Sequence, residues 1–217
     1  MAENRINPRE CVSLKDSLRR LPEITAQYGN CEDGLVRELI GEIDPLEDIY
    51  SLLDSAIVDE ETPVLITEGR LIKDGYNEEL DNLRTMEGNS TSFILSLEYA
   101  ERERTGIKNL KIKHNKVFGY FIEVSKSNLD QVPYDYIRKQ TIANGERFVT
   151  AELRQQEEKL RNVQERIIQS EYDLFIELRG ELAHHLDRLQ KTARAVAELD
   201  VICSFASLAA DKNYTMP

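Results

Sequence analysis

The fold is decided by Glu101-Arg-Glu-Arg-Thr-Gly-Ile-Lys-Asn-Leu-Lys-Ile-Lys-His-Asn-Lys-Val-Phe-Gly-Tyr-Phe-Ile-Glu-Val124, because the spacing of apolar residues changes within it. Up to Thr105 these residues follow a helical period, and Gly106 is typical of a helix end. From Leu110 onward they alternate or run together, in a segment rich in Val, Ile, Phe and Tyr. The change predicts a long helix followed by a β-hairpin, with its tight turn at His114-Asn115-Lys116.

A helix is predicted upstream of this stretch, over residues 77–105. Gly75-Tyr76-Asn77 supplies its N-terminal cap, and Gly88-Asn89-Ser90 weakens it locally. A stripe of apolar residues marks the face that we expect to be buried: Leu80, Leu83, Ile94, Leu97 and Ala100.

A second, longer helix is predicted downstream. Short extended pieces come first, separated by the turn-forming Ala143-Asn144-Gly145: residues 134–139 and 147–149. Thr150 is then a suitable N-cap, and apolar residues recur at seven-residue spacing: Leu153, Leu160, Ile167 and Leu174. Only Gly180 interrupts the pattern before Lys212, so we expect one helix of roughly 60 residues and on the order of 90 Å.

The N-terminal part of the chain is predicted to be helical as well. Apolar residues follow a 3.6-residue period over 8–27, where Pro22 can kink or end the helix, and Asp44-Pro45 divides a second amphipathic stretch in two. Residues 63–72 are predicted to form two short extended pieces around Glu68-Gly69. The whole pattern predicts a mainly α fold, in which two long antiparallel helices carry a small antiparallel β-rich module inserted at their tip.

The composition excludes several classes of protein. The chain has 217 residues and a formal net charge of -12, and no apolar run approaches the roughly 18 residues of a membrane span, so neither a generally basic nucleic-acid coat nor membrane insertion is predicted. The N-terminus lacks the apolar core of a signal peptide. The cysteines are too few and too scattered for a zinc site or a disulfide framework: Cys11, Cys31 and Cys203. We therefore expect a cytoplasmic protein with no membrane partner.

The charges divide unevenly along the chain. Residues 105–150 contain eight Lys and Arg against four Asp and Glu, a balance of +4, whereas the remainder has 20 against 36, a balance of -16. Clustered Lys and Arg favour a phosphate backbone, and acidic helices discourage binding elsewhere. The pattern predicts a polyanion site at the tip. Two alternatives remain open: a plain solvated surface on the β module, and a helical scaffold that binds protein without contacting DNA.

Polar residues in the predicted turns fit a polyanion. Asn115 and Lys116 lie in one turn and Asn144 in another, and further polar side chains follow the hairpin: Ser125, Ser127 and Asn128. Such groups hydrogen-bond phosphate oxygens without reading sequence. Aromatic residues also alternate through the hairpin, which fits strand packing better than a platform for stacked bases.

No catalytic site is predicted. His184 and His185 are adjacent on a helix and point in different directions, whereas a metal pair on a helix needs i, i+4 spacing. The chain has no phosphate-binding loop, no dinucleotide-binding glycine motif and no nucleophile elbow. Glu157-Glu158 is expected on a charged helix face, paired with neighbouring Arg and Lys side chains. We therefore expect no enzyme activity, no metal and no cofactor in this chain.

Several motifs occur in a distinctive order along the chain: Gly75-Tyr-Asn-Glu-Glu-Leu-Asp, Glu101-Arg-Glu-Arg-Thr-Gly-Ile, Lys113-His-Asn-Lys-Val-Phe-Gly-Tyr-Phe-Ile-Glu-Val, Tyr136-Ile-Arg-Lys-Gln-Thr and Ala197-Glu-Leu-Asp-Val. In this order they resemble the bacterial MutS family of DNA mismatch repair proteins. The resemblance runs from about residue 5 to residue 217, and it includes Asn7-Pro-Arg-Glu near the start and Asn213-Tyr-Thr-Met-Pro at the end.

The resemblance implies three parts: residues 5–104 as the first core and lever helices, 105–149 as the clamp, and 150–217 as the returning lever helix. In the family, the clamp contacts the duplex backbone without sequence preference, and the levers connect it to an ATPase. The motifs for ATP, with its magnesium, and for reading a mismatch belong to other parts of the family's chain. We therefore expect a non-catalytic part of a homodimer that binds double-stranded, and particularly mismatched, DNA.

The resemblance also assigns site residues, because the family's clamp contacts fall by position on Asn115 and Asn144. Together with the charges it predicts four phosphate contacts: Asn115, Lys116, Lys139 and Asn144. Three further residues are expected to contribute electrostatically: Lys113, Lys126 and Arg138. Gly145 departs from the family's common Asn-Ala-Glu-Arg pattern, in which alanine follows the asparagine.

Overall fold

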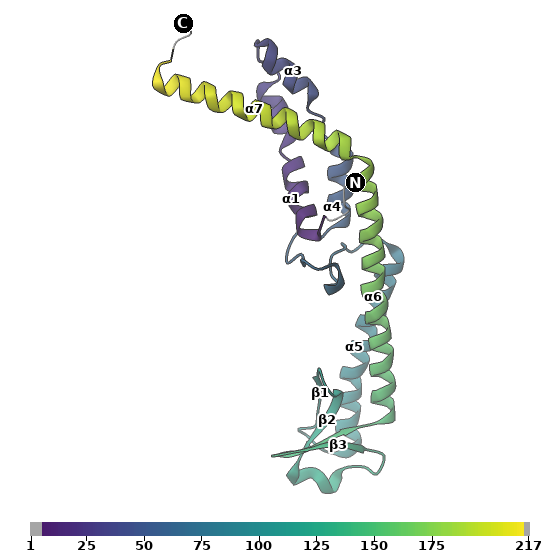
Figure 1. Cartoon of the computed structure of the whole chain (residues 1–217). Coiled ribbons are helices and arrows are strands. Elements are labelled where there is room, and N and C mark those ends of the chain that lie inside the picture. Colours follow the sequence, from purple (N-terminus) through teal and green to yellow (C-terminus); the bar gives the residue numbers. More distant parts are fainter. Residues whose placement is uncertain (1–5, 215–217) are drawn as a thin grey trace. The chain divides into compact units, whose positions relative to one another are not determined.

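The computed structural model describes residues 6–214, and it is mainly helical with one four-stranded antiparallel sheet (Figure 1). This confirms the predicted fold class. The chain divides into two compact units: residues 77–170, here called the sheet unit, and residues 1–76 with 171–217, here called the helical unit. Arg5 and residues 215–217, which the predicted first part and last motif include, lie outside the described residues.

Two long helices of the sheet unit begin and end where local signals place them: α5 (Glu78–Thr105) and α6 (Ala151–His184, of which residues up to 170 belong to this unit). The Asn77 side chain accepts a hydrogen bond from the backbone N–H of Leu80 at 3.0 Å. Gly106 ends α5 with φ 71°, a conformation that glycine adopts without strain. Thr150 Oγ1 accepts a hydrogen bond from the Leu153 N–H at 3.1 Å and so caps α6 as predicted.

α5 and α6 lie side by side and antiparallel in the sheet unit (Figure 1). Gln164 of α6 donates to Glu87 of α5 at 2.9 Å, and Arg166 of α6 pairs with Glu79 of α5 at 3.6 Å. A later residue of α6 therefore contacts an earlier residue of α5, as expected for antiparallel helices. Four of the five predicted stripe residues of α5 are buried, whereas Ala100 is exposed, because the buried stripe turns with the helix away from that position.

The sheet consists of short strands: β1 (Lys111–Asn115), β2 (Gly119–Ser125), β3 (Ile137–Ile142) and β4 (Gly145–Val149), with a 3-10 turn η2 (Lys126–Gln131) after β2. The strand order is β1-β2-β4-β3. Ala143 and Asn144 form the predicted tight turn between β3 and β4. The first turn lies two residues later than predicted, at 116–118, because His114 pairs with Tyr120 and extends the strand.

An apolar cluster holds the sheet to the helices. Its buried members come from both helices, from the connections near them and from the two central strands: Ile94, Leu97, Ile107, Leu110, Ile122, Val124, Tyr136, Phe148, Val149, Leu153 and Leu160. The Tyr136 hydroxyl is satisfied there by a 2.8 Å hydrogen bond to Glu101, itself paired with Arg104 at 2.9 Å. The cluster fixes which face of the sheet is covered, and therefore which face is left for a ligand.

The helical unit contains the end of α6 and five further helices: α1 (Pro8–Leu18), α2 (Leu21–Tyr28), α3 (Gly34–Glu42), α4 (Glu47–Ala56) and α7 (Leu186–Lys212). The predicted division at Asp44-Pro45 is confirmed. The stretch predicted as one helix over 8–27 is two helices, because Pro22 stands in the first turn of α2, where its missing N–H costs no hydrogen bond. Residues 66–68 form a 3-10 turn, η1, so the prediction of two extended pieces is wrong apart from an isolated bridge between Ile57 and Ile72.

The predicted single helix of about 60 residues is wrong. The helix is interrupted at His185, whose N–H bonds to the carbonyl of Leu182, three residues back rather than four. Arg188 bonds to Asp44 at 2.8 Å and to Asp48 at 2.6 Å, so the start of α7 is fixed by the α3–α4 turn.

A buried lysine joins two helices of this unit, α1 and α4. Lys15 of α1 bonds to Asp54 at 3.2 Å and to Asp59, and Lys73 also bonds to Asp59, at 2.9 Å. Burial works against the Lys15 charge, but the hydrogen bonds with the two carboxylates outweigh it, and the pKa of Lys15 is raised. The same bonds lower the pKa of Asp59. The network ties α1 to α4 and to the segment that follows it.

Candidate nucleic-acid interface

The two faces of the sheet differ in chemistry. One face packs against the helices and carries Ile122 and Phe148, which pair across β2 and β4. Successive residues of a strand point to opposite faces, so their neighbours lie on the other, outer face. There β2 contributes Phe121 and Glu123, and β4 contributes Arg147. The outer face of the central strands therefore carries charges of both signs.

The β1–β2 turn, residues 116–118, holds two of the predicted phosphate contacts. Asn115 ends β1, and its Oδ1 accepts a hydrogen bond from the Val117 N–H at 2.7 Å. This oxygen shapes the turn, and the side-chain amide hydrogens remain for a ligand. Lys116 is exposed, and no acidic side chain among residues 6–214 lies within ion-pair distance of its ammonium.

Gly119 and Glu157 fix this turn against α6. Glu157 Oε1 accepts a hydrogen bond from the Tyr120 N–H at 3.2 Å, and a Cβ on Gly119 would overlap that carboxylate. Gly119 also has φ 69°, which disfavours any other residue. The prediction that Glu157 pairs with basic neighbours on its own helix is wrong, because its carboxylate bonds to the strand backbone instead.

Lys139 joins the same turn from the opposite edge of the sheet. The register between β3 and β4 shifts between Arg138 and Gln140, which leaves Lys139 at a bulge. Its ammonium donates to the Phe118 carbonyl at 3.0 Å. The structure therefore brings Asn115, Lys116 and Lys139 together, although Lys139 follows the other two by more than 20 positions.

Asn144 lies at the opposite end of the sheet. Its carbonyl accepts a hydrogen bond from the Lys126 N–H at 3.1 Å, so these two predicted residues form a second group. Gly145 lets the strands approach, because a Cβ there would overlap the carbonyl of Val124. The seven residues of β2 separate the two turns, a distance of about 20 Å at the usual rise of about 3.3 Å per residue.

Two of the predicted electrostatic contributors are paired within the sheet. Lys113 bonds to Glu123 at 2.7 Å, and Arg138 bonds to Glu146 at 3.3 Å. The hydrogen bond from Lys113, helped by Arg147, lowers the pKa of Glu123, so this carboxylate stays ionised. Lys113 and Arg138 therefore have less charge to offer a ligand than Lys116 and Lys126.

Arg147 is a site residue that sequence reasoning missed. Its guanidinium lies 4.4 Å from the centre of the Phe121 ring, donates to Gln140 at 2.8 Å and approaches Glu123 at 3.5 Å. Strand alternation could have placed it on the outer face with Glu123. Its side chain is only 22% exposed, so it organises the face more than it reaches outward.

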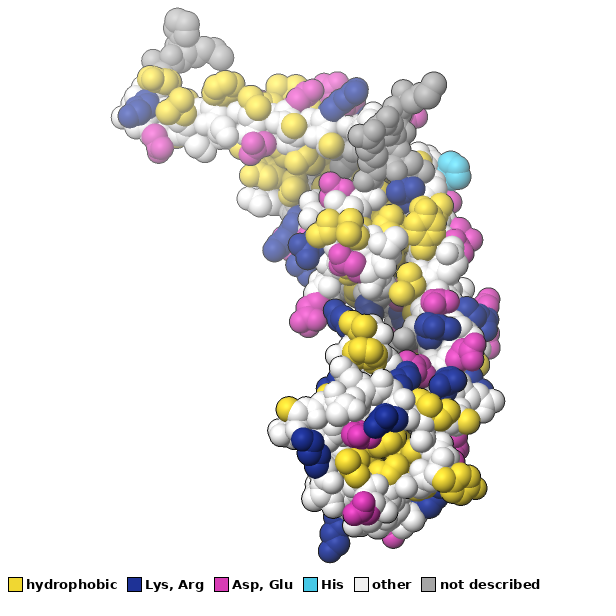
Figure 2. Space-filling model, turned by 60° about the horizontal axis from the view of Figure 1, so that its bottom comes forward, with side chains coloured by type: hydrophobic (Ala, Val, Ile, Leu, Met, Phe, Trp, Pro, Cys, Tyr) yellow, Lys and Arg dark blue, Asp and Glu magenta, His cyan; other side chains and the backbone are white. Residues whose placement is uncertain are grey.

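Figure 2 turns the lower end of the molecule forward, where the sheet lies. Lys and Arg side chains are spaced around apolar surface there, and they do not merge into one continuous basic patch. The sheet unit carries two further exposed cations: Lys108 and Lys111 have no ion-pair partner in the described part of the chain. A flexible or extended polyanion would therefore contact these separated charges one at a time.

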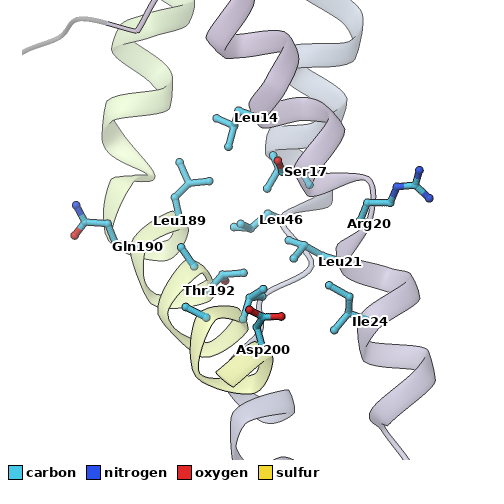
Figure 3. Close-up of a pocket in the computed structure, with 14 residues that line it drawn as sticks. Leu14, Ser17, Arg20, Leu21, Ile24, Leu46, Leu189, Gln190, Thr192 and Asp200 are labelled. Atoms are coloured by element: carbon cyan, nitrogen blue, oxygen red, sulfur yellow. The ribbon is translucent and has the colours of Figure 1, made fainter. Parts of the chain in front are cut away.

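A second candidate site is an apolar groove in the helical unit, with a volume of about 720 Å³. Figure 3 shows Leu14 and Leu21 from α1 and α2 facing Leu189 of α7 across it, with Leu46 between them. The charged lining residues are Arg20 and Asp200. The groove suits an apolar side chain or helix face and offers little to a phosphate.

His184 and His185 lie outside both sites. His184 and His185 both contact Glu181, at 3.4 and 3.3 Å, and His185 also contacts Arg188 at 3.3 Å. Within residues 6–214 no group of three or more His, Cys, Asp or Glu side chains is arranged to hold a metal ion. In the same range, no helix is long and apolar enough to cross a membrane.

The fold and the site define a class: a helical protein in which two antiparallel helices carry a small sheet with a polar, lysine-bearing turn at each end. The family model described as MutS family domain IV matches residues 75–166, which include that sheet, all of α5 and the first part of α6. The relatives extend the match to nearly the whole chain, and the chain belongs to the MutS family.

Three of these relatives carry the name DNA mismatch repair protein MutS. The protein of Alkaliphilus oremlandii (strain OhILAs) is 49% identical over 210 residues, which cover 97% of this chain and 24% of the relative. That of Caldicellulosiruptor saccharolyticus is 47% identical over 212 residues, covering 98% and 24%. That of Clostridium botulinum (strain Hall) is 45% identical over 218 residues, covering 100% and 23%. The chain spans about a quarter of the length of these relatives.

Proposed function

We propose that the sheet of this chain contacts the backbone of duplex DNA without reading its sequence, as the clamp of a mismatch repair protein. The observation that carries the proposal is the pair of turns, Asn115-Lys116 and Asn144 with Lys126, at opposite ends of a basic sheet. Amide and ammonium groups donate to phosphate oxygens but carry no information about base identity. The name of the relatives, DNA mismatch repair protein, supports the same reading.

The roles of the residues follow from their pairing. Lys116 and Lys126 supply full charges, Asn115 and Asn144 supply amide donors, and Lys139 holds the first turn while its remaining N–H groups serve the same phosphate. These contacts are few, so we expect the isolated chain to bind at the non-specific level, with Kd about 10⁻⁴ M or weaker at physiological salt.

The test is duplex binding by fluorescence anisotropy at low and moderate salt. A Lys116→Ala, Asn144→Ala double variant should bind more weakly and with a shallower salt dependence. Lys159→Ala with Asn89→Ala removes the same residue types from exposed positions on α6 and α5, and it should bind as the parent does. An unchanged affinity of the first variant would reject the assigned contact surface.

The role of the whole protein is an inference from the family. We expect the helices to act as levers between this clamp and an ATPase that lies elsewhere in a longer chain, where ATP and magnesium would bind. Moving rigid helices as bodies is an established way to transmit such a change. A homodimer that encloses mismatched DNA completes the proposal, and this chain itself would perform no catalysis.

The groove in the helical unit favours a second candidate, a protein-binding scaffold without DNA contact. The chain itself carries a suitable occupant, because the end of α7 exposes apolar side chains at helical spacing: Val201, Phe205 and Leu208. A second copy of the chain is therefore the partner to test. Sedimentation should then show a dimer that Ala193→Glu, within the groove, dissociates. A monomer at high concentration would reject this candidate.

A further inference from the structure

The β1–β2 turn exposes an apolar side chain beside its cation. Val117 is 81% exposed and Phe118 is 39% exposed, directly after Lys116. Lys139 reaches the same turn through the Phe118 carbonyl. An apolar residue is thus exposed in a turn that carries one lysine and is contacted by another, at a position where a polar residue would be better solvated.

The fold does not require an apolar side chain at Val117. The turn is held by the side-chain oxygen of Asn115 on the Val117 N–H, by the positive φ of Gly119 and by the Glu157 carboxylate on the Tyr120 N–H. All three use backbone groups or other side chains, and none needs the Val117 methyl groups. β-Branched residues are also uncommon in tight turns, where Asn, Asp, Gly and Ser are favoured.

A ligand for this turn must combine negative charge with apolar surface a few ångströms away. Duplex DNA has this combination, because deoxyribose rings line the walls of the minor groove between the phosphates. Proteins that enter the minor groove use basic and amide side chains together with apolar ones. An acidic peptide would satisfy the lysines but would leave the valine in water.

We propose that Val117 packs against the deoxyribose wall of the minor groove while Lys116 and Lys139 contact the flanking phosphates. The inference rests on the proposed function and adds an uncharged contact to it. The expected signature of the Val117 contact is an effect on affinity that does not depend on salt, since no counterion is released when a methyl group leaves water.

The first measurement uses tryptophan fluorescence, because the chain contains no tryptophan. Val117→Trp places one fluorescent reporter in the turn. Addition of a 20-base-pair duplex at a saturating concentration should shift the tryptophan emission to shorter wavelength and reduce its quenching by acrylamide. Leu95→Trp places the reporter at a 67% exposed position on α5, and its emission should not change. Circular dichroism of both variants before titration shows whether they are folded.

The second measurement separates the apolar contact from the charges. Val117→Thr keeps the shape of the side chain but replaces one methyl group with a hydroxyl, and we expect affinity to fall about threefold to fivefold, comparable to the loss of one buried methylene. The slope of log affinity against log salt should be unchanged. Lys116→Ala should reduce that slope by nearly one.

The outcomes distinguish the two proposals. If the unmodified chain shows no salt-dependent duplex binding, the proposed function fails. If it binds and Lys116→Ala weakens it, but Val117→Thr binds equally and DNA leaves the emission of the Val117→Trp variant unmoved, only the groove contact fails. An emission shift with single-stranded but not duplex DNA would also reject the minor-groove assignment.

Discussion

The helical unit and the sheet unit use the same ionic groups in opposite ways. In the helical unit, Lys15 and Arg188 are each held by two carboxylates from distant parts of the sequence, and they join helices. In the sheet, Lys116 and Lys126 have no carboxylate partner among the described residues. Pairing, and not residue type, therefore separates lysines that hold the fold from lysines that are left for a ligand.

Gly119→Ala should have the largest effect on this contrast, because it distorts the β1–β2 turn, which exposes the unpaired Lys116. The added methyl group meets the Glu157 carboxylate at a positive φ, and we expect a loss of about 3 kcal/mol of unfolding free energy, from backbone strain and the lost Tyr120 hydrogen bond. Urea denaturation measures it. Gly88→Ala, in open space on α5, should stabilise by about 0.5–1 kcal/mol. Equal effects of the two changes would contradict the close packing.

Replacing one lysine from each unit by methionine tests the contrast directly. Lys15→Met should cost about 2 kcal/mol of stability, less than the loss of about 3–5 kcal/mol typical of a fully buried pair, because Asp54 and Asp59 are nearly half exposed. Lys116→Met should change stability by less than about 0.5 kcal/mol but weaken duplex binding. Thermal denaturation and anisotropy on both variants make the comparison. A Lys15→Met protein that is as stable as the parent would contradict the contrast between paired and unpaired lysines.

Glu123→Gln tests whether internal pairing limits the charge available to DNA. The change frees Lys113 and Arg147 from a shared carboxylate, so duplex affinity at low salt should rise by about threefold, with a steeper salt dependence. Glu158→Gln removes the same charge from an exposed position on α6, and its gain should be smaller. If both variants gain equally, net charge alone governs binding.

Acidification should produce the smallest effect, at the α3–α4 turn. Hydrogen bonds from Arg188 lower the pKa of Asp44 and of Asp48, so their stabilising contribution is complete above the ordinary aspartate value of 3.8 and is lost as pH falls below it. Both side chains are more than a third exposed, which limits the contribution to below about 1 kcal/mol. The stability difference between the parent and Arg188→Met, measured by urea at pH 7 and at pH 3, should shrink at pH 3.

The features that could be predicted from the sequence are those with local causes. The bounds of α5 follow from Asn77 and Gly106, and the two-residue turn before Gly145 follows from its own residues. The contacts that fix the start of α7 could not be predicted, because Arg188 bonds to carboxylates about 140 positions earlier. The later position of the first turn depends on strand register, which adjacent residues do not reveal.

The candidate site shows the same limit. Charge counting located the sheet as the basic part of the chain, but the strand order β1-β2-β4-β3 decides that the predicted residues form two groups. Lys139 reaches the first group only through its bulge, and Arg147 was overlooked because its contacts to Phe121 and Gln140 come from neighbouring strands. Whether these residues touch DNA stays a prediction.

If the sheet binds duplex DNA as proposed, the separation of the two turns also sets a minimum size for that duplex. A span of about 20 Å corresponds to about six base pairs of duplex at about 3.4 Å each, if the axis follows β2. A shorter oligonucleotide would reach one turn at a time and gain nothing from the second. Affinity should therefore rise in a step as the duplex lengthens past that size. Binding to the sheet would then depend on the length of the duplex and not on its base sequence.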